Sequence, residues 1–129
     1  MTINEYQKLA MRTAWAKTKD DLPPKVMILL ESGAMTKEEL LLLNGVLGLG
    51  GESGEGLDLV KKNIFQGHEL DFDHVAKELG DIAWYLAVSA TAIGYNLETI
   101  MQMNIDKLRK RYPEGFDAER SLHREEGDI

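Results

Sequence analysis

The chain has 129 residues, 43% of them hydrophobic and 29% charged, a composition typical of one compact globular domain and unlike that of disordered or membrane-embedded chains. Its net charge of -7 argues against nucleic acid as the main partner, because phosphate backbones are bound chiefly by an excess of Lys and Arg. The absence of cysteine excludes disulfides, thiolate metal sites and cysteine nucleophiles.

The N-terminal segment, MTINEYQKLA, has neither the basic nor the apolar region of a secretory signal, so we expect a cytoplasmic protein. Thr2 to Glu5 fits a capping box, which predicts a helix from there to about Thr18. Pro23 and Pro24 then stop this helix. A short apolar turn, KVMILLE, is expected next.

Two long helices are predicted in the middle of the chain. A second capping box, Thr36 to Glu39, opens the first of them, and Gly67 among polar residues marks its end. The next helix begins near Phe72 and stops at Gly94. Because these helices would be joined by a short turn, we expect them to form an antiparallel hairpin.

The helix expected from Phe72 is apolar on two sides. One face is formed by Val75, Leu79, Ile82, Leu86 and Ile93, at the spacing of 3 and 4 residues that a helix face requires. Trp84 lies opposite this face. A helix with two apolar sides is buried on both, and in so short a chain a second subunit would cover one of them, a C2 dimer being the commonest arrangement.

The last predicted helix runs from Asn96, a plausible N-cap, to about Arg111. No segment alternates apolar and polar residues as a strand does, so the predicted fold class is all-α with four main helices. We expect one domain over residues 1–124 and a mobile acidic tail over 125–129.

Two pairs of acidic residues carry the chemical signal. Glu52 and Glu55 form one E-x-x-E pair, and Glu78 and Asp81 form an E-x-x-D pair. Residues at i and i+3 share a helix face, and the two pairs are equally distant from the predicted turn at Gly67, so the four carboxylates should converge. Such a cluster is costly without a cation. Hard oxygen ligands favour Mg²⁺, with Mn²⁺ or Ca²⁺ as substitutes, whereas the Glu-x-x-His motif of di-iron bundles is missing.

Glycines surround the first acidic pair. Helix interiors disfavour glycine by roughly 1 kcal/mol against alanine, so a helix here needs a reason, such as the close approach of a neighbouring backbone or ligand. The alternative is that the segment is a loop. The six glycines concerned are Gly45, Gly48, Gly50, Gly51, Gly54 and Gly56.

A polar and basic stripe follows on the last predicted helix. Asn104, Lys107 and Arg111 stand at i, i+3 and i+7 and would share one face. Such a stripe could hold phosphate oxygens. The alternative is a solvated cationic helix end that is stabilised by the helix dipole.

Three segments, GLGGESGEGLDLVKK, KELGDIAWYLA and NIDKLRKRYPEGF, resemble the MazG-like family of all-α nucleoside triphosphate pyrophosphohydrolases over residues 44–124. The resemblance implies an oligomeric four-helix core, a homodimer or homotetramer, with the metal site on its helical hairpin. It also implies Mg²⁺-dependent hydrolysis of a nucleoside triphosphate, NTP or dNTP, to the monophosphate and pyrophosphate, as in nucleotide-pool house-cleaning.

The resemblance also implies roles for individual residues. Glu52, Glu55, Glu78 and Asp81 match the Mg²⁺ ligands, and Glu52 or Glu55 could accept the proton of the attacking water. Candidate phosphate, sugar or base contacts are Lys61, Lys62, Tyr85, Asn104, Lys107, Arg111, Tyr112 and Trp15. For Trp15, core packing is the alternative to stacking on the base. His68 and His123 are expected to be solvated surface residues.

Two functions from other classes compete with hydrolysis. One is a non-catalytic helical interaction module that senses metal or nucleotide. The other is a purely structural helical dimer, which would gain no stability from Mg²⁺, whereas any bound ligand stabilises the folded state.

Overall fold

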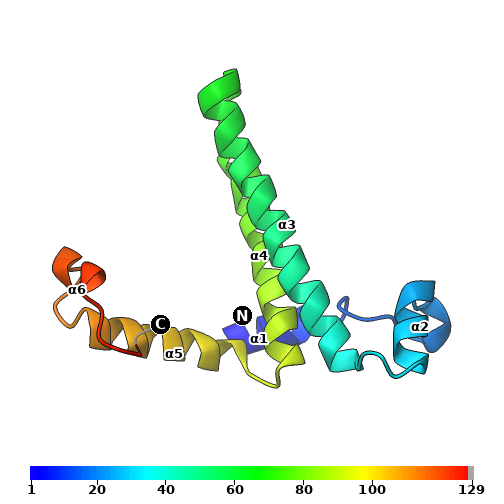
Figure 1. Ribbon diagram of the computed structural model, residues 1–129. Coiled ribbons are helices and arrows are strands. Elements are labelled where there is room, and N and C mark those ends of the chain that lie inside the picture. Colours follow the sequence, from blue (N-terminus) through cyan, green and yellow to red (C-terminus); the bar gives the residue numbers. More distant parts are fainter. Residues whose placement is uncertain (128–129) are drawn as a thin grey trace. The chain divides into compact units, whose positions relative to one another are not determined.

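The computed structural model describes residues 1–127. Within this range it contains helices and no strand, which confirms the predicted all-α class. The elements, drawn in Figure 1, are α1 (Ile3–Ala10), the 3₁₀ turn η1 (Lys19–Asp21), α2 (Pro24–Glu31), α3 (Lys37–Gln66), α4 (Phe72–Ala92), α5 (Leu97–Arg111) and α6 (Ala118–Leu122). The chain divides into two compact units, Met1–Leu97 and the residues from Glu98 on.

The long helix α3 has the ends that its sequence predicts. Thr36 Oγ1 accepts a hydrogen bond from Glu39 N at 3.1 Å, and Glu39 Oε2 accepts one from Thr36 N at 2.7 Å. This reciprocal pair satisfies two donors that would otherwise lack partners. The helix ends at Gly67, whose φ of +72° is the left-handed conformation that favours glycine.

Helices α3 and α4 lie side by side (Figure 1). Gly45 lies against Ser89 and Gly48 lies against the ring of Tyr85, so closely that an added Cβ would overlap either neighbour. The predicted reason for glycine, a close approach of the neighbouring helix, is therefore confirmed at these two positions. As residue numbers rise along α3 they fall along α4, so the two helices run in opposite directions.

The other four glycines of this segment do not serve that purpose. A Cβ added to Gly50, Gly51, Gly54 or Gly56 would meet no atom within 4 Å. The loop alternative is also wrong, since the whole segment is helical. At these positions the glycines leave the surface of α3 open.

Gln7 fixes α1 to the end of α4. Its side chain is buried, and its Nε2 donates to Thr91 Oγ1 and to the carbonyl oxygen of Tyr95, both at 2.9 Å. Its Oε1 accepts from Leu97 N at 2.7 Å. The buried amide is thus fully used, as burial of a polar group requires.

The first helix is shorter than predicted. It ends at Ala10 rather than near Thr18. The Ala10 carbonyl accepts a hydrogen bond from Thr13 N at 3.2 Å, three residues further on, and also accepts from two side chains. Thr13 Oγ1 donates to it at 3.1 Å, and Trp84 Nε1 donates to it at 3.2 Å. Trp84 therefore contacts this segment of the same chain, and its side chain is half-buried.

The opposite side of α4 remains largely open. Leu79 and Leu86 are 59% and 39% exposed, whereas Ala87 and Val88 are fully buried. Exposed apolar side chains recur at seven-residue intervals on both long helices, except that Gly50 takes the place between Leu43 and Leu57 on α3. They are Leu43, Leu57 and Ile64 on α3, and Phe72, Leu79 and Leu86 on α4 with Ile93 directly after it.

Two helices were not expected from the sequence. The segment KVMILLE, predicted as a turn, forms α2, which begins with Pro24 at its first position, where a missing amide costs nothing. Helix α6 starts at Asp117, whose side chain accepts from Arg120 N at 2.9 Å.

Two further expectations concern the ends and the surface of the chain. Of the expected acidic tail 125–129, residues 128 and 129 lie outside the described residues. Over the described part of the chain, no helix is both long and apolar enough to cross a membrane.

Candidate functional site

Three carboxylates converge where α3 packs on α4. Glu52, Glu55 and Glu78 each place an oxygen within 4.8 Å of the other two. Glu78 is only 7% exposed, Glu52 is half-buried and Glu55 is exposed. The i, i+3 spacing brings the first two together, and helix packing adds the third.

The negative charges of these carboxylates repel one another. The pKa of Glu52 is raised above its ordinary value, first by burial and then by the charges of Glu55, Asp81 and Glu78. A hydrogen bond with Glu78 contributes in the same direction. The folded chain therefore holds the Glu52 carboxylate in an environment that a cation would relieve.

Asp81, the fourth predicted ligand, lies near this group but is not one of the three. It is exposed, and its charge acts on both Glu52 and Tyr6. The hydroxyl of Tyr6 donates to the Gly80 carbonyl oxygen at 3.4 Å, and its pKa is raised by burial and then by the Asp81 charge. Tyr6 on α1 thus contacts α4 next to Asp81.

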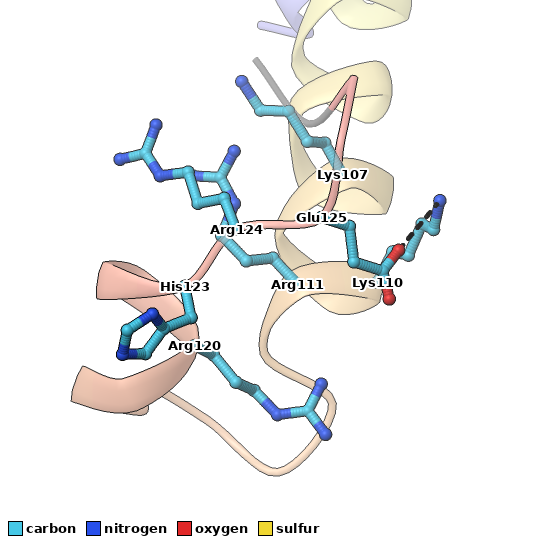
Figure 2. Close-up of a pocket in the computed structure, with 7 residues that line it drawn as sticks. All are labelled: Lys107, Lys110, Arg111, Arg120, His123, Arg124 and Glu125. Atoms are coloured by element: carbon cyan, nitrogen blue, oxygen red, sulfur yellow. Dashed lines mark ion pairs between the residues drawn. The ribbon is translucent and has the colours of Figure 1, made fainter.

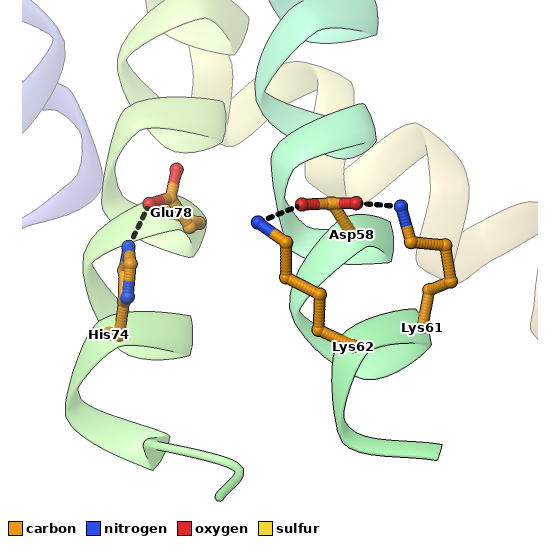
Figure 3. A network of polar contacts seen from close by, with 5 residues as sticks. All are labelled: Asp58, Lys61, Lys62, His74 and Glu78. Atoms are coloured by element: carbon orange, nitrogen blue, oxygen red, sulfur yellow. Dashed lines mark hydrogen bonds and ion pairs between the residues drawn. The ribbon is translucent and has the colours of Figure 1, made fainter. Parts of the chain in front are cut away.

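His74 is a site residue that the sequence analysis missed. Its Nε2 lies 2.9 Å from Glu78 Oε1, as Figure 3 shows. The H-x-x-x-E spacing, i to i+4 on one helix face, could have revealed this contact. A histidine that holds one oxygen of a buried carboxylate restricts the orientation of that carboxylate.

Asp58 was also missed, and it changes the interpretation of two predicted residues. Lys61 and Lys62 both pair with it, Lys62 Nζ at 2.6 Å from Asp58 Oδ2 (Figure 3). Hydrogen bonds from the two ammonium groups lower the pKa of Asp58 to about 2. Both lysines, predicted to contact phosphate, are thus engaged with this carboxylate.

A cavity of about 430 Å³ opens beside the carboxylates. Gly51 and Gly54 lie in its wall, where the lack of a side chain keeps the space open. Other groups in its lining include Glu55, Glu78, Lys62 and His74. Acidic oxygens and an ammonium group therefore face one space large enough for a small ligand.

Two of the three predicted aromatic contacts, Tyr85 and Trp15, take part in packing. The Tyr85 ring lies over Gly48 and meets Trp84 edge to face, with ring centroids 4.8 Å apart. Trp15 packs against the core formed by Ala14, Leu41 and Val88. The ammonium of Lys37 lies 5.4 Å from its ring centroid.

The remaining predicted contacts belong to the second unit. Asn104 and Lys107 are exposed on α5, and Arg111 and Tyr112 are half-buried at its end. The Arg111 guanidinium lies 5.8 Å from the Tyr112 ring centroid. The expected exposure of His68 and His123 is confirmed, although His123 Nε2 lies 3.5 Å from a Glu119 oxygen.

The chain is similar in sequence to known proteins. The family described as "MazG nucleotide pyrophosphohydrolase domain" matches residues 42–116. The Gene 37 protein of Mycobacterium phage L5 is 36% identical over 73 residues, a match that covers 54% of this chain and 64% of the phage protein. The chain thus spans less than two thirds of that relative's length. No solved structure matches the chain.

Proposed function

Because the chain belongs to the MazG nucleotide pyrophosphohydrolase domain family, we propose that it hydrolyses a nucleoside triphosphate, NTP or dNTP, to the monophosphate and pyrophosphate with the help of Mg²⁺. The observation that carries this proposal is the convergence of Glu52, Glu55 and Glu78 within 4.8 Å. Three such groups can hold a divalent ion.

The donor set fits a hard cation. All three groups offer carboxylate oxygens, which Mg²⁺ prefers, and none offers sulfur. The raised pKa of Glu52 supports the same conclusion, since repulsion among the acids is relieved by positive charge. We propose Glu52, Glu55 and Glu78 as ligands, with Asp81 as the fourth and with Mn²⁺ as a substitute ion.

When bound, such an ion neutralises phosphoryl oxygens and makes a water molecule more acidic. The chain itself supplies the proton acceptor. Glu52 and Glu55 are the candidates. The buried Glu78, held by His74, orients the site. No covalent intermediate is required.

Substrate contacts are proposed on both units. Lys62 lies in the cavity wall with the acids, and its ammonium group could exchange Asp58 for a phosphate oxygen. Lys61, which pairs with the same carboxylate, could make the same exchange. Tyr85 and Trp15 border the packed helices, where nucleotide contact would add to their packing role. In the second unit the proposed contacts are Asn104, Lys107, Arg111 and Tyr112.

The test is a panel of NTPs and dNTPs with Mg²⁺, with products identified by phosphorus NMR. We expect nucleoside monophosphate and pyrophosphate in equal amounts, and no product in EDTA. Nucleoside diphosphate with orthophosphate would refute the proposal. Thermal stabilisation by nucleotide without any product would instead favour the non-catalytic sensing module.

We also propose that the chain forms a homo-oligomer through the exposed apolar stripes of α3 and α4. Apolar residues at a seven-residue repeat are the pattern of helices that pack against further helices, and a second hairpin would complete a four-helix core. Leu57→Asp with Leu79→Asp should therefore yield monomers in light scattering. Ile28→Asp, at a position on α2 that is 64% exposed, is the control and should leave the mass unchanged.

A further inference from the structure

The second unit contains a basic cavity that the acidic site does not explain. It has a volume of about 130 Å³ and lies between the C-terminal part of α5 and α6, as Figure 2 shows. Lys107, Lys110 and Arg111 form one wall. Arg120, His123 and Arg124 form the other.

The local sequence brings the two walls together. After α5 the chain turns at Gly115, whose φ of +101° favours glycine. The rings of Tyr112 and Phe116 meet across this turn with centroids 5.5 Å apart. Asp117 then caps α6 through Arg120 N, so the side chains after the turn come back against α5.

The charges of the lining are strongly unequal. Among residues 1–127, five Lys or Arg side chains line the cavity together with one carboxylate, Glu125. That carboxylate lies 3.9 Å from Lys110 Nζ. Among the described residues, Lys107, Arg120 and Arg124 form no ion pair. Like charges held around one space repel, and an anion with several oxygens would compensate them together.

We infer that this cavity binds the phosphate chain of an oligophosphate, with Arg120 and Arg124 as binding residues alongside Lys107. The cavity has room for about four water molecules at roughly 30 Å³ each, a size suited to a small polyanion. Guanidinium groups bind phosphate oxygens in pairs. The inference rests on the proposed function only for the expectation that the protein meets phosphate chains; the charges and the space are independent of it.

The experiment is calorimetric titration of the full chain with pyrophosphate in EDTA, so that no divalent ion bridges the ligand to the acidic helices. Removing two guanidinium groups that donate to the ligand should weaken binding by at least about tenfold, which corresponds to about 1.4 kcal/mol. The variant is Arg120→Gln with Arg124→Gln. Unchanged affinity in this variant would overturn the inference, provided that its circular dichroism matches that of the wild type.

Two single variants sharpen the test. Arg109 lies on the same helix outside the cavity lining and near Asp106, so Arg109→Gln should change the affinity by less than about twofold. Glu125→Gln removes the one acid of the lining and should strengthen binding. A weaker complex with Glu125→Gln, or an equal loss with Arg109→Gln, would speak for diffuse surface charge and against a defined site.

Further titrations distinguish the sources of the phosphate chain. ATP in EDTA should bind and lose affinity in the double arginine variant, and adenosine should not bind there. Binding of a short DNA duplex in place of pyrophosphate would overturn the inference. Glu78→Gln should leave pyrophosphate binding in EDTA unchanged. A failure of the proposed hydrolysis and a failure of the basic cavity to bind phosphate can therefore be told apart.

Discussion

The two charged sites of this protein are built in opposite ways. The acidic group lies on two packed helices, with Glu78 only 7% exposed and its orientation restricted by His74. The basic cavity is lined by long side chains at the end of α5 and on the five-residue helix α6, and the Lys110 side chain is 83% exposed. One site is fixed by the core, and the other is formed largely by solvated side chains.

This difference predicts how each site selects its ligand. Because packing and His74 hold the Glu78 carboxylate in place, a cation that matches the acidic group in charge and size relieves its repulsion. Flexible Lys and Arg side chains can adjust to an anion, but ordering them costs rotamer entropy. The acidic site should therefore be sensitive to packing changes, and the basic cavity should be sensitive mainly to charge and salt.

The largest effect is expected from Glu78→Gln. Removing a buried ligand from the acidic group should lower the rate of pyrophosphate release by at least about 100-fold, roughly 2.7 kcal/mol in the activation barrier. Glu69→Gln, at an exposed acid in the turn before α4, is the matched control. Activity within about threefold of wild type in Glu78→Gln would show that the carboxylates do not hold the catalytic ion.

A second prediction tests whether packing fixes the acidic site. Gly48→Ala places a methyl group where the Tyr85 ring lies, which should lower the free energy of unfolding by about 1–2 kcal/mol despite alanine's better helix propensity. Gly50→Ala on the same helix meets no atom within 4 Å, so it should raise stability by up to about 1 kcal/mol. Chemical denaturation measures both.

The opposite signs make this pair of variants decisive. Equal stabilisation by Gly48→Ala and Gly50→Ala would mean that α3 and α4 are not in close contact at Tyr85. Pyrophosphate binding in EDTA should be the same in both variants, because the basic cavity lies in the other unit.

A smaller effect is expected at His74. His74→Ala removes the contact that holds one oxygen of Glu78, and loss of such a supporting contact weakens metal affinity by about tenfold or somewhat more. Calorimetric titration with Mn²⁺ measures it. His68→Ala, at an exposed position in the nearby turn, should leave the affinity unchanged, and equal effects of the two variants would remove His74 from the site.

Much of the acidic site could be predicted from the sequence because its geometry is local. The i, i+3 spacing and the predicted helix boundaries at Thr36, Gly67 and Phe72 place the three glutamates on helix faces, and an antiparallel pairing then brings the faces together. His74 follows the same helical periodicity and could have been found. The fold class follows equally directly from the absence of strand patterns.

The parts that escaped prediction depend on tertiary contacts. At the end of α1 the Ala10 carbonyl accepts from the indole of Trp84, which lies 74 residues further along the chain. The buried face of α4 is decided by α3 and α1, which is why Leu79 is open although its spacing predicts a core face. The walls of the basic cavity meet only because the turn at Gly115 folds α6 back. Helical periodicity contains none of this information.

The smallest prediction concerns the metal-free protein. The pKa of Glu52 is raised in the folded state, so its charged form destabilises the fold, and this loss of stability appears as the pH rises through the raised pKa. Glu52→Gln should therefore raise the melting temperature in EDTA at pH 7. Below the ordinary pKa of 4.5 the acid is protonated in both states, and the difference should vanish.

Saturating Mg²⁺ should reverse the order of the melting temperatures of wild type and Glu52→Gln. The ion binds the folded wild type and compensates the repulsion, so the wild type should gain more stability from Mg²⁺ than Glu52→Gln does. Glu69→Gln serves as the control and should follow the wild type in both buffers. A lower melting temperature of Glu52→Gln in EDTA would mean that the carboxylate stabilises the metal-free site. The acidic group would then not be repulsive, and its contrast with the adaptable basic cavity would be wrong.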